Sequence, residues 1–367
     1  MANIIIDCEK MRNHNSGFYY FCKNLVTEII AQADPQQDHL SLYLPKQAWP
    51  TFNHYPNVLF HKKWHKHFFP LSNPPDVWHC TTQQSRYLPT SRKAKIVLTI
   101  HDINVLYEFP DDKRLIKSTL KAMQQRIDRA EMIVTISDYV KADVLKQLWI
   151  GDKPIKTIYN GCNLPPQQRF EPPKSPPPGE FLFALGYVNA KKNFHVLPSL
   201  LKGNDYTLVI GGVCDDMPYR QKIIDEARKH GVEQRLILTG GLSENDKYWY
   251  FSQCAAFLFP SLAEGFGLPP VEAMYFGKPV FLSEKTCLPE IGGDAAYYFQ
   301  NFEPEHLREV FTNGMAKALQ DPNHAARMQA QAARFNWQNV AQHYHKPIII
   351  FHNQHATRYL DQQTTLA

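Results

Sequence analysis

Residues 260–280 read PSLAEGFGLPPVEAMYFGKPV, and this stretch decides the fold. The apolar run before it predicts a strand that ends at Pro260, and a glycine-containing loop follows. We expect a helix to begin near Pro269, because proline suits the first helical position, and to end at Gly277. The apolar run that starts at Pro279 predicts the next strand. A strand, a helix and a strand in this order indicate a parallel βαβ unit.

The same alternation of short apolar runs and helical patterns extends over the rest of the chain. In the first half, it predicts strands at 3–7, 40–44, 58–61, 76–80, 95–102, 132–137 and 156–160, and helices over 17–31 and 113–130. In the second half, it predicts strands at 181–187, 207–212, 235–241, 255–260 and 279–283. We therefore predict an α/β chain of two doubly wound, Rossmann-like domains that face each other across a cleft. Ligands of such domains bind at the carboxyl ends of the strands.

Proline is concentrated in PPQQRFEPPKSPPPGE, residues 165–180. Because proline excludes strand and helix interiors, this stretch is interpreted as a stiff, extended linker. It divides the chain into a first domain over 1–164, a second domain over 181–340 and a C-terminal segment over 341–367. A long proline-rich loop inside a single domain is the alternative.

Composition and charge exclude several classes of protein. Of the 367 residues, 44% are hydrophobic and 20% are charged, which is typical of globular proteins. No apolar window suits a membrane-spanning helix and the N-terminus has no signal-peptide pattern, so we expect a cytoplasmic protein. The seven cysteines are scattered and form no CxxC pair, which argues against a disulfide framework or a zinc site.

Positive charge is concentrated in the first half of the chain, where residues 1–165 carry 21 Lys and Arg against 15 Asp and Glu. Such a half is compatible with nucleic acid, with an anionic membrane surface or with a solvated basic face. The stretch HKKWHKHFF (61–69) mixes basic and aromatic residues, and it fits either a peripheral contact with the membrane or a partly buried strand and loop.

The loop that follows the strand ending at Pro260 carries the residues best suited to chemistry. It delivers Glu264 to the start of the expected helix, and Glu272 lies about one turn further on. Four backbone amides lie between them, those of Gly265, Phe266, Gly267 and Leu268. A helix N-terminus binds anions, because its amides point outward and the helix dipole is positive there. The structural alternatives are a solvated loop carboxylate for Glu264 and an ordinary first-turn glutamate for Glu272.

The segment EGFGLPPVEAM (264–274), with two glutamates separated by seven residues, resembles the signature of family 4 of the retaining glycosyltransferases. The resemblance continues in five further segments, which read LPEIGGDAAYYF (288–299), LGYVNAKKN (185–193), VLTIHDINVL (97–106), MIVTISDYVKADVL (132–145) and KTIYNGCN (156–163). These segments cover nearly the whole chain in the order that the family has. The resemblance implies the GT-B fold, with an acceptor-binding first domain, a nucleotide-sugar-binding second domain and a C-terminal segment that crosses back to the first.

The resemblance also implies a role for particular residues of the second domain. Glu264 would meet the hydroxyls of the donor sugar, and Glu272 would hold the ribose hydroxyls. The amides of Gly265 to Leu268 would contact sugar and phosphate. Lys192 would neutralise the diphosphate, in the same basic loop as Gly186. Many family members have an arginine in this loop, and here Lys191 supplies a second charge without the bidentate fork of arginine.

In the first domain, His101 would face the donor sugar, and Gly17 would let the phosphates and the acceptor approach the backbone. The three residues expected to be catalytic are thus Glu264, His101 and Lys192. His101 also fits a satisfied core histidine, and Gly17 also fits a simple turn.

By this resemblance, the chain is expected to move a hexose to a saccharide or lipid-linked saccharide in lipopolysaccharide, O-antigen or capsule synthesis, at the inner face of the cell membrane. The segments PSLAEGFGLPP and HDINVLY are most similar to mannosyl- and rhamnosyltransferases, so GDP-mannose is the first choice of donor and a UDP-hexose the second. The lysines and the helix end would neutralise the diphosphate, so no metal or other cofactor is expected, and no nucleic-acid partner either.

Three other functions remain open at this point. A dinucleotide-dependent oxidoreductase would need a GxGxxG turn after its first strand, which the sequence does not supply. A non-catalytic partner subunit that binds a nucleotide sugar is the second, and turnover would exclude it. A phosphorylase or nucleotide-sugar hydrolase on the same fold is the third, and phosphate or water as the acceptor would identify it.

Overall fold

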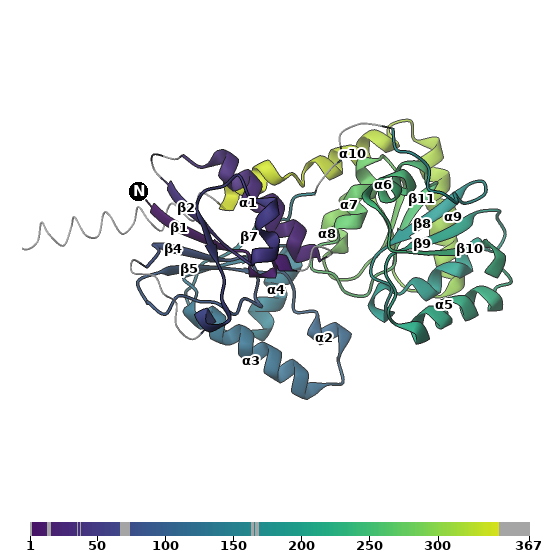
Figure 1. Cartoon of the computed structure of the whole chain (residues 1–367). Coiled ribbons are helices and arrows are strands. Elements are labelled where there is room, and N and C mark those ends of the chain that lie inside the picture. Colours follow the sequence, from purple (N-terminus) through teal and green to yellow (C-terminus); the bar gives the residue numbers. More distant parts are fainter. Residues whose placement is uncertain are drawn as a thin grey trace, which may run out of the picture. The chain divides into compact units, whose positions relative to one another are not determined.

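The computed structural model describes residues 2–12, 16–34, 36, 38–66, 74–162, 165 and 169–344. The chain forms two compact units. The first comprises Met1–Gly161 together with the chain from Asn336 onward, and the second comprises Cys162–Phe335. Each unit is an α/β layer structure around one parallel sheet (Figure 1). The prediction of two doubly wound domains is therefore confirmed.

The first unit is built on a seven-stranded sheet in the order β3-β2-β1-β4-β5-β6-β7. Its strands are β1 (Ala2–Asp7), β2 (Asp38–Leu44), β3 (Val58–Phe60), β4 (Val77–Cys80), β5 (Lys95–Ile100), β6 (Met132–Thr135) and β7 (Ile155–Thr157). Its helices are α1 (Gly17–Gln32), α2 (Val105–Glu108), α3 (Lys113–Arg129) and α4 (Asp138–Gln147), with 3-10 turns η1 (Glu9–Arg12), η2 (Lys46–Thr51) and η3 (Lys63–Lys66). The strands are rich in buried Ile, Val and Leu because helices cover both faces of the sheet.

The second unit has a six-stranded sheet in the order β10-β9-β8-β11-β12-β13. Its strands are β8 (Phe181–Leu185), β9 (Thr207–Gly211), β10 (Leu236–Gly240), β11 (Ala256–Phe259), β12 (Val280–Ser283) and β13 (Tyr297–Phe299). Its helices are α5 (Met217–Lys229), α6 (Glu244–Gln253), α7 (Leu268–Tyr275), α8 (Leu288–Gly292), α9 (Pro304–Gln320) and α10 (His324–Ala333), with 3-10 turns η4 (Ala190–Lys192), η5 (Phe194–Leu201), η6 (Glu233–Arg235) and η7 (Gly293–Ala295). The pattern analysis did not predict β13.

The strand order reverses once in each sheet, and the reversal positions the functional loops. In the first sheet β1 pairs with both β2 and β4, and in the second β8 pairs with both β9 and β11. At such a switch point, two neighbouring strands send their connections in opposite directions, which leaves a crevice beyond their carboxyl ends.

The proline-rich stretch lies with the second unit in its described part. The Phe170 ring is buried, with its centroid 5.4 Å from that of Tyr248 and 6.0 Å from that of Phe276. The backbone N–H of Glu171 donates to the Asn245 side chain at 3.3 Å. The second unit therefore starts at Cys162, before the prolines, whereas the sequence placed the start of the domain at 181.

The C-terminal part of the chain returns to the first unit. Residues 337–344 are helical, and Trp337, Val340, Ala341 and Tyr344 are part of the hydrophobic core around β1 and α1. The Tyr344 hydroxyl lies 3.2 Å from Thr99 Oγ1 of β5. The return starts at Asn336, a few residues earlier than the predicted segment 341–367, of which residues 345–367 lie outside the described part.

The basic and aromatic stretch 61–69 is described as far as residue 66, so Phe68 and Phe69 lie outside the described residues. His65 is buried and its Nδ1 lies 2.9 Å from the Tyr43 hydroxyl, whereas Trp64 is 46% exposed. The stretch forms the 3-10 turn η3 instead of a strand. In the described part of the chain, no helix has both the length and the apolar composition that a membrane crossing requires.

Substitution of Gly161 tests how closely the helical residues 337–344 pack on the first unit. A Cβ atom at this position would lie 2.5 Å from the Trp337 ring and 2.7 Å from the Trp337 backbone nitrogen. We expect Gly161→Ala to lower the free energy of unfolding by about 1–3 kcal/mol through overpacking. Denaturant unfolding of the full chain measures it. Gly17→Ala is the matched control, because a Cβ there meets no atom within 4 Å, and equal losses in both variants would contradict the packing.

Candidate functional site

An ion pair joins the two loops at the switch point of the second sheet. Lys192 follows β8 and Glu264 follows β11, and Lys192 Nζ donates to Glu264 Oε1 at 2.6 Å. Each side chain is only 12% exposed. The two residues are 72 positions apart in the sequence, and the pairing of β8 with β11 brings them together.

Several further contacts fix this loop geometry. Ser261 Oγ donates to Glu264 Oε1 at 2.5 Å, and the backbone N–H of Leu262 donates to the Lys191 carbonyl at 2.8 Å. From the next strand over, Thr286 Oγ1 accepts the backbone N–H of Glu264 at 3.1 Å. The carboxylate thus has a preset orientation at the carboxyl edge of three adjacent strands.

The electrostatics keep Glu264 ionised in spite of its burial. Burial raises the pKa of Glu264, but Lys192, Lys191 and the Ser261 hydroxyl outweigh it, so the pKa lies below its ordinary value. Lys192 Nζ also lies 4.6 Å from the centre of the Phe259 ring, a cation–π contact. A charged carboxylate and a charged ammonium therefore coexist in a largely buried site.

The glycines of these loops leave room for the charged groups. A Cβ on Gly186 would lie 3.0 Å from Lys192 Cε, so the glycine makes space for the lysine stem. Gly267 caps α7 with a φ of +99°, and a Cβ there would lie 2.9 Å from Leu288. Leu268 is the first residue of α7, and Gly265 and buried Phe266 lead into it.

The second glutamate of the signature has a partner that the sequence did not indicate. Glu272 is buried in α7, and Lys247 Nζ of α6 donates to Glu272 Oε1 at 2.7 Å. Lys247 Nζ also lies 4.3 Å from the Tyr248 ring centre. Burial raises the pKa of Glu272, and Lys247 opposes that shift. Lys247 lies in an ordinary polar helix, so only the packing of α6 on α7 reveals it.

In the first unit, His101 lies just beyond the end of β5. It is buried, its Nε2 lies 2.8 Å from the Thr81 carbonyl, and its backbone N–H donates to Gln83 Oε1 at 3.0 Å. Burial lowers the pKa of His101 to about 4, so the ring is neutral near pH 7. A carbonyl accepts only from a protonated nitrogen, so Nε2 carries the hydrogen and Nδ1 is an acceptor.

Gly17 is the first residue of α1, and Ser16 caps this helix by accepting the Tyr19 backbone N–H at 3.2 Å. The next residue, Phe18, packs edge-on against His101 at 4.9 Å between ring centroids. The structure thus brings Gly17 and His101 into one neighbourhood of the first unit. The other predicted site residues, Glu264, Lys192, Lys191, Glu272, Gly186 and 265–268, gather in the second.

Solved structures share the fold of these two α/β units, which is the GT-B fold. Sucrose-phosphate synthase from Thermosynechococcus elongatus aligns with a TM-score of 0.69 over 97% of this chain and 100% of its own, at 15% identity. Anabaena HepE, in complex with UDP and glucose, aligns with a TM-score of 0.65 over 95% and 99%, at 17% identity.

Family models cover both units. Residues 26–164 match the model of Glycosyltransferase Family 4, and residues 167–335 match that of Glycosyl transferases group 1. The chain belongs to glycosyltransferase family 4. The resemblance that the signature indicated is confirmed.

Several relatives are mannosyltransferases by name. A 176-residue segment is 33% identical to the serotype-specific mannosyltransferase WbdA of Escherichia coli, covering 45% of this chain but only 21% of that protein. The O-antigen chain mannosyltransferase B of Escherichia coli is 26% identical over 69% of each chain. The O-antigen chain mannosyltransferase RfbU of Salmonella typhimurium is 26% identical over 72% of this chain and 70% of its own.

Lys247 can be tested through nucleotide binding. We expect Lys247→Met to weaken nucleoside diphosphate binding by about tenfold at pH 7, because buried Glu272 loses its ammonium partner and its pKa rises further. The loss should grow as the pH falls from 8 to 6, since protonation removes the carboxylate. Calorimetric titrations over this range measure it. Lys229→Met, on the exposed face of α5, is the control, and pH-independent binding by Lys247→Met would refute the role.

Proposed function

We propose that this enzyme transfers a mannosyl residue from GDP-mannose to a saccharide or lipid-linked saccharide acceptor, with retention of the anomeric configuration. The observation that carries the proposal is the buried Lys192–Glu264 pair at the β8–β11 switch point. The choice of mannose draws on the relatives named as O-antigen mannosyltransferases, and O-antigen or related surface-glycan synthesis is the proposed context.

The second unit would bind the donor. The diphosphate would lie over the N-terminus of α7, where the helix dipole favours negative charge and the backbone N–H groups of Gly267 and Leu268 would donate to it. Lys192 and Lys191 would add positive charge from the neighbouring loop. Glu272 would accept hydrogen bonds from the ribose hydroxyls.

Glu264 would hold the sugar. Its second carboxylate oxygen, Oε2, is available to hydroxyls of the hexose, while Oε1 receives Ser261 and Lys192. Because the carboxylate is already oriented and charged, it can fix the sugar ring without rearrangement of the loop. In the first unit, His101 Nδ1 would accept a hydrogen bond from a sugar hydroxyl, and Gly17 would allow close approach at the start of α1.

The reaction breaks the bond between the anomeric carbon and the diphosphate oxygen and forms a bond from that carbon to the acceptor oxygen. Negative charge grows on the leaving diphosphate, and Lys192, Lys191 and the α7 amides stabilise it. The acceptor hydroxyl attacks from the face that the diphosphate leaves, and a diphosphate oxygen takes its proton. This route needs no protein nucleophile and retains the configuration.

A UDP-hexose is the alternative donor. Its support is that the solved structures of similar fold include HepE in complex with UDP-glucose. A thermal-shift panel of GDP, UDP, ADP, dTDP and their common sugar conjugates, with and without EDTA, separates these donors. We expect GDP and GDP-mannose to stabilise the full chain, equally well with EDTA, since binding to the native state alone raises its stability. Stabilisation by no nucleotide would refute the proposal.

The site itself is tested by substitution. We expect Glu264→Gln and Lys192→Ala each to lower the transfer rate by about 10²–10³-fold, because each removes a group that stabilises the transition state. Lys192→Ala also leaves Glu264 buried without its partner, so its melting temperature has to be measured alongside. The exposed substitutions Glu309→Gln and Lys202→Ala are controls. Near-normal turnover in both site variants would overturn the mechanism.

A further inference from the structure

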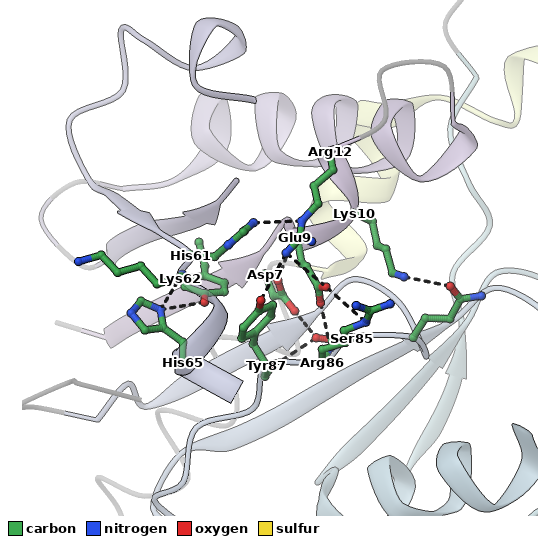
Figure 2. Close-up of polar contacts among 12 residues, drawn as sticks. Asp7, Glu9, Lys10, Arg12, His61, Lys62, His65, Ser85, Arg86 and Tyr87 are labelled. Atoms are coloured by element: carbon green, nitrogen blue, oxygen red, sulfur yellow. Dashed lines mark hydrogen bonds and ion pairs between the residues drawn. The ribbon is translucent and has the colours of Figure 1, made fainter. Parts of the chain in front are cut away.

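The switch point of the first sheet carries its own cluster of charged side chains, which the donor chemistry does not use. Figure 2 shows them gathered around Glu9, just beyond the ends of β1, β3 and β4. The members are Asp7, Glu9, Lys10 and Arg12 from the end of β1 and η1, His61 after β3, and Ser85, Arg86 and Tyr87 from the loop after β4.

Two carboxyl groups form the buried floor of this cluster. Asp7 is 1% exposed, and it accepts from Ser85 Oγ and, at 2.9 Å, from the Glu9 backbone N–H. Burial raises the pKa of Asp7 to about 7, so a large share of this group is protonated at neutral pH. Glu9 is also buried, and its Oε2 accepts the Arg86 backbone N–H at 2.9 Å.

Arg12 lies above this floor in a fixed orientation. Its Nε donates to His61 Nε2 at 3.1 Å, and its Nη2 donates to the Tyr87 hydroxyl at 3.3 Å (Figure 2). The His61 and Tyr87 rings stack at 5.6 Å. Burial and the Arg12 charge together lower the pKa of His61 to about 4, so His61 is neutral. Neutral partners thus orient the guanidinium without compensating its charge.

Positive charge exceeds negative charge in this cluster. Lys10, Arg12 and Arg86 carry three positive charges, and Arg126 adds a fourth where its Nε donates to the Ser85 carbonyl at 2.8 Å. Glu9 carries one negative charge, so the excess is +3 with Asp7 protonated and +2 with Asp7 ionised. The ion contacts of Glu9 with Arg12 and Arg86 are long, 3.9 Å each. The Arg12 side chain is 42% exposed and that of Arg86 is 66% exposed. The acids are therefore buried while the cations reach the solvent.

The loop after β4 connects this cluster to His101. Its first residue, Thr81, accepts from His101 Nε2, and Gln83 accepts from the His101 backbone N–H. Further along the same loop are Ser85 and Tyr87, which contact Asp7 and Arg12. A ligand bound by Arg12 would therefore lie along the loop that also supports His101, the residue proposed to meet the donor sugar.

We propose that Arg12, Arg86 and Lys10 form a subsite for a phosphate group borne by the saccharide acceptor. The assignment rests on the proposed function, because it takes the first unit as the acceptor-binding unit. An excess charge of +2 to +3 matches a phosphate monoester, which carries about −1.5 to −2 at pH 7, better than a carboxylate with a single charge. Arg12 offers the planar fork of donors that suits phosphate oxygens.

The test compares two ligands that differ in the group on the anomeric oxygen, the anionic phosphate of α-mannose 1-phosphate and the neutral methyl group of methyl α-mannoside. Each is titrated calorimetrically into the full chain with the nucleoside diphosphate that binds the second unit present at saturation, so that the donor site is occupied. We expect the phosphate to bind about tenfold tighter than the neutral glycoside, a difference of about 1.4 kcal/mol, and this advantage to shrink with added salt.

Substitutions of arginine test whether the tighter binding of the phosphate comes from the proposed subsite. Arg12→Gln should remove most of the advantage of the phosphate, and Arg86→Gln, at an exposed side chain, should remove part of it. Arg92→Gln is the matched control, because this exposed arginine precedes β5 and thus lies at the opposite edge of the sheet. Nucleotide affinity should be unchanged in all three, since the second unit is intact.

Other outcomes would contradict part of the proposal. Equal affinity for the two ligands, or an unchanged phosphate advantage in both Arg12→Gln and Arg86→Gln, overturns the subsite. An advantage that Arg92→Gln also loses would show a general charge effect and overturns it too. If the phosphate fails to bind but the chain binds phosphatidic acid vesicles in an Arg12-dependent way, the group recognised is a lipid headgroup and the saccharide assignment is wrong. If no nucleotide binds the full chain, the proposed donor chemistry is refuted. Nucleotide affinity is measured in its own titration, so this result is distinguishable from failure of the phosphate subsite.

Discussion

The pairing of β8 with β11 is the constraint on which the functional architecture depends. It places the loops after two strands from different parts of the sequence at one edge of the sheet, and Lys192 and Glu264 meet there at 2.6 Å. Ser261 and Thr286 then fix the carboxylate, and Gly267 lets α7 begin immediately beyond it. A sheet without this reversal of strand order would leave the two charges on loops that face different helices.

Burial of these charges has a physical cost that the site offsets locally. Each signature glutamate is removed from water and has one lysine within hydrogen-bonding distance, Lys192 for Glu264 and Lys247 for Glu272. A buried pair of this kind contributes little net stability, because desolvation consumes most of the Coulomb attraction. The buried ion pair instead orients the carboxylate, so that a charged group lies at a defined position and can accept hydrogen bonds from ligand hydroxyl groups.

Both units bury carboxyl groups at the switch point of their sheet, but the balance of charges around these groups differs between the units. At the switch point of the first sheet, Asp7 and Glu9 are buried beside a larger number of cations, and Arg12 is held by the neutral groups of His61 and Tyr87. In the second unit each buried glutamate has a lysine within hydrogen-bonding distance, and Lys191 adds a further positive charge near Glu264. The cluster in the first unit contributes part of the excess of positive charge over residues 1–165.

The sequence by itself determined the α/β class, most strand positions, the helices over 17–31 and 113–130 and the one that begins near Pro269, and the family. Periodicity, proline and glycine positions and the spacing of Glu264 and Glu272 are local properties. The sequence also indicated Lys192, through a short loop motif. Only the tertiary structure decided that Lys192 pairs with Glu264, that Lys247 pairs with Glu272, that Arg12 lies beside His61, and that residues 337–344 complete the first core. These contacts join positions from 25 to more than 200 residues apart, and no local pattern encodes them, because strand order and helix packing alone bring such positions together.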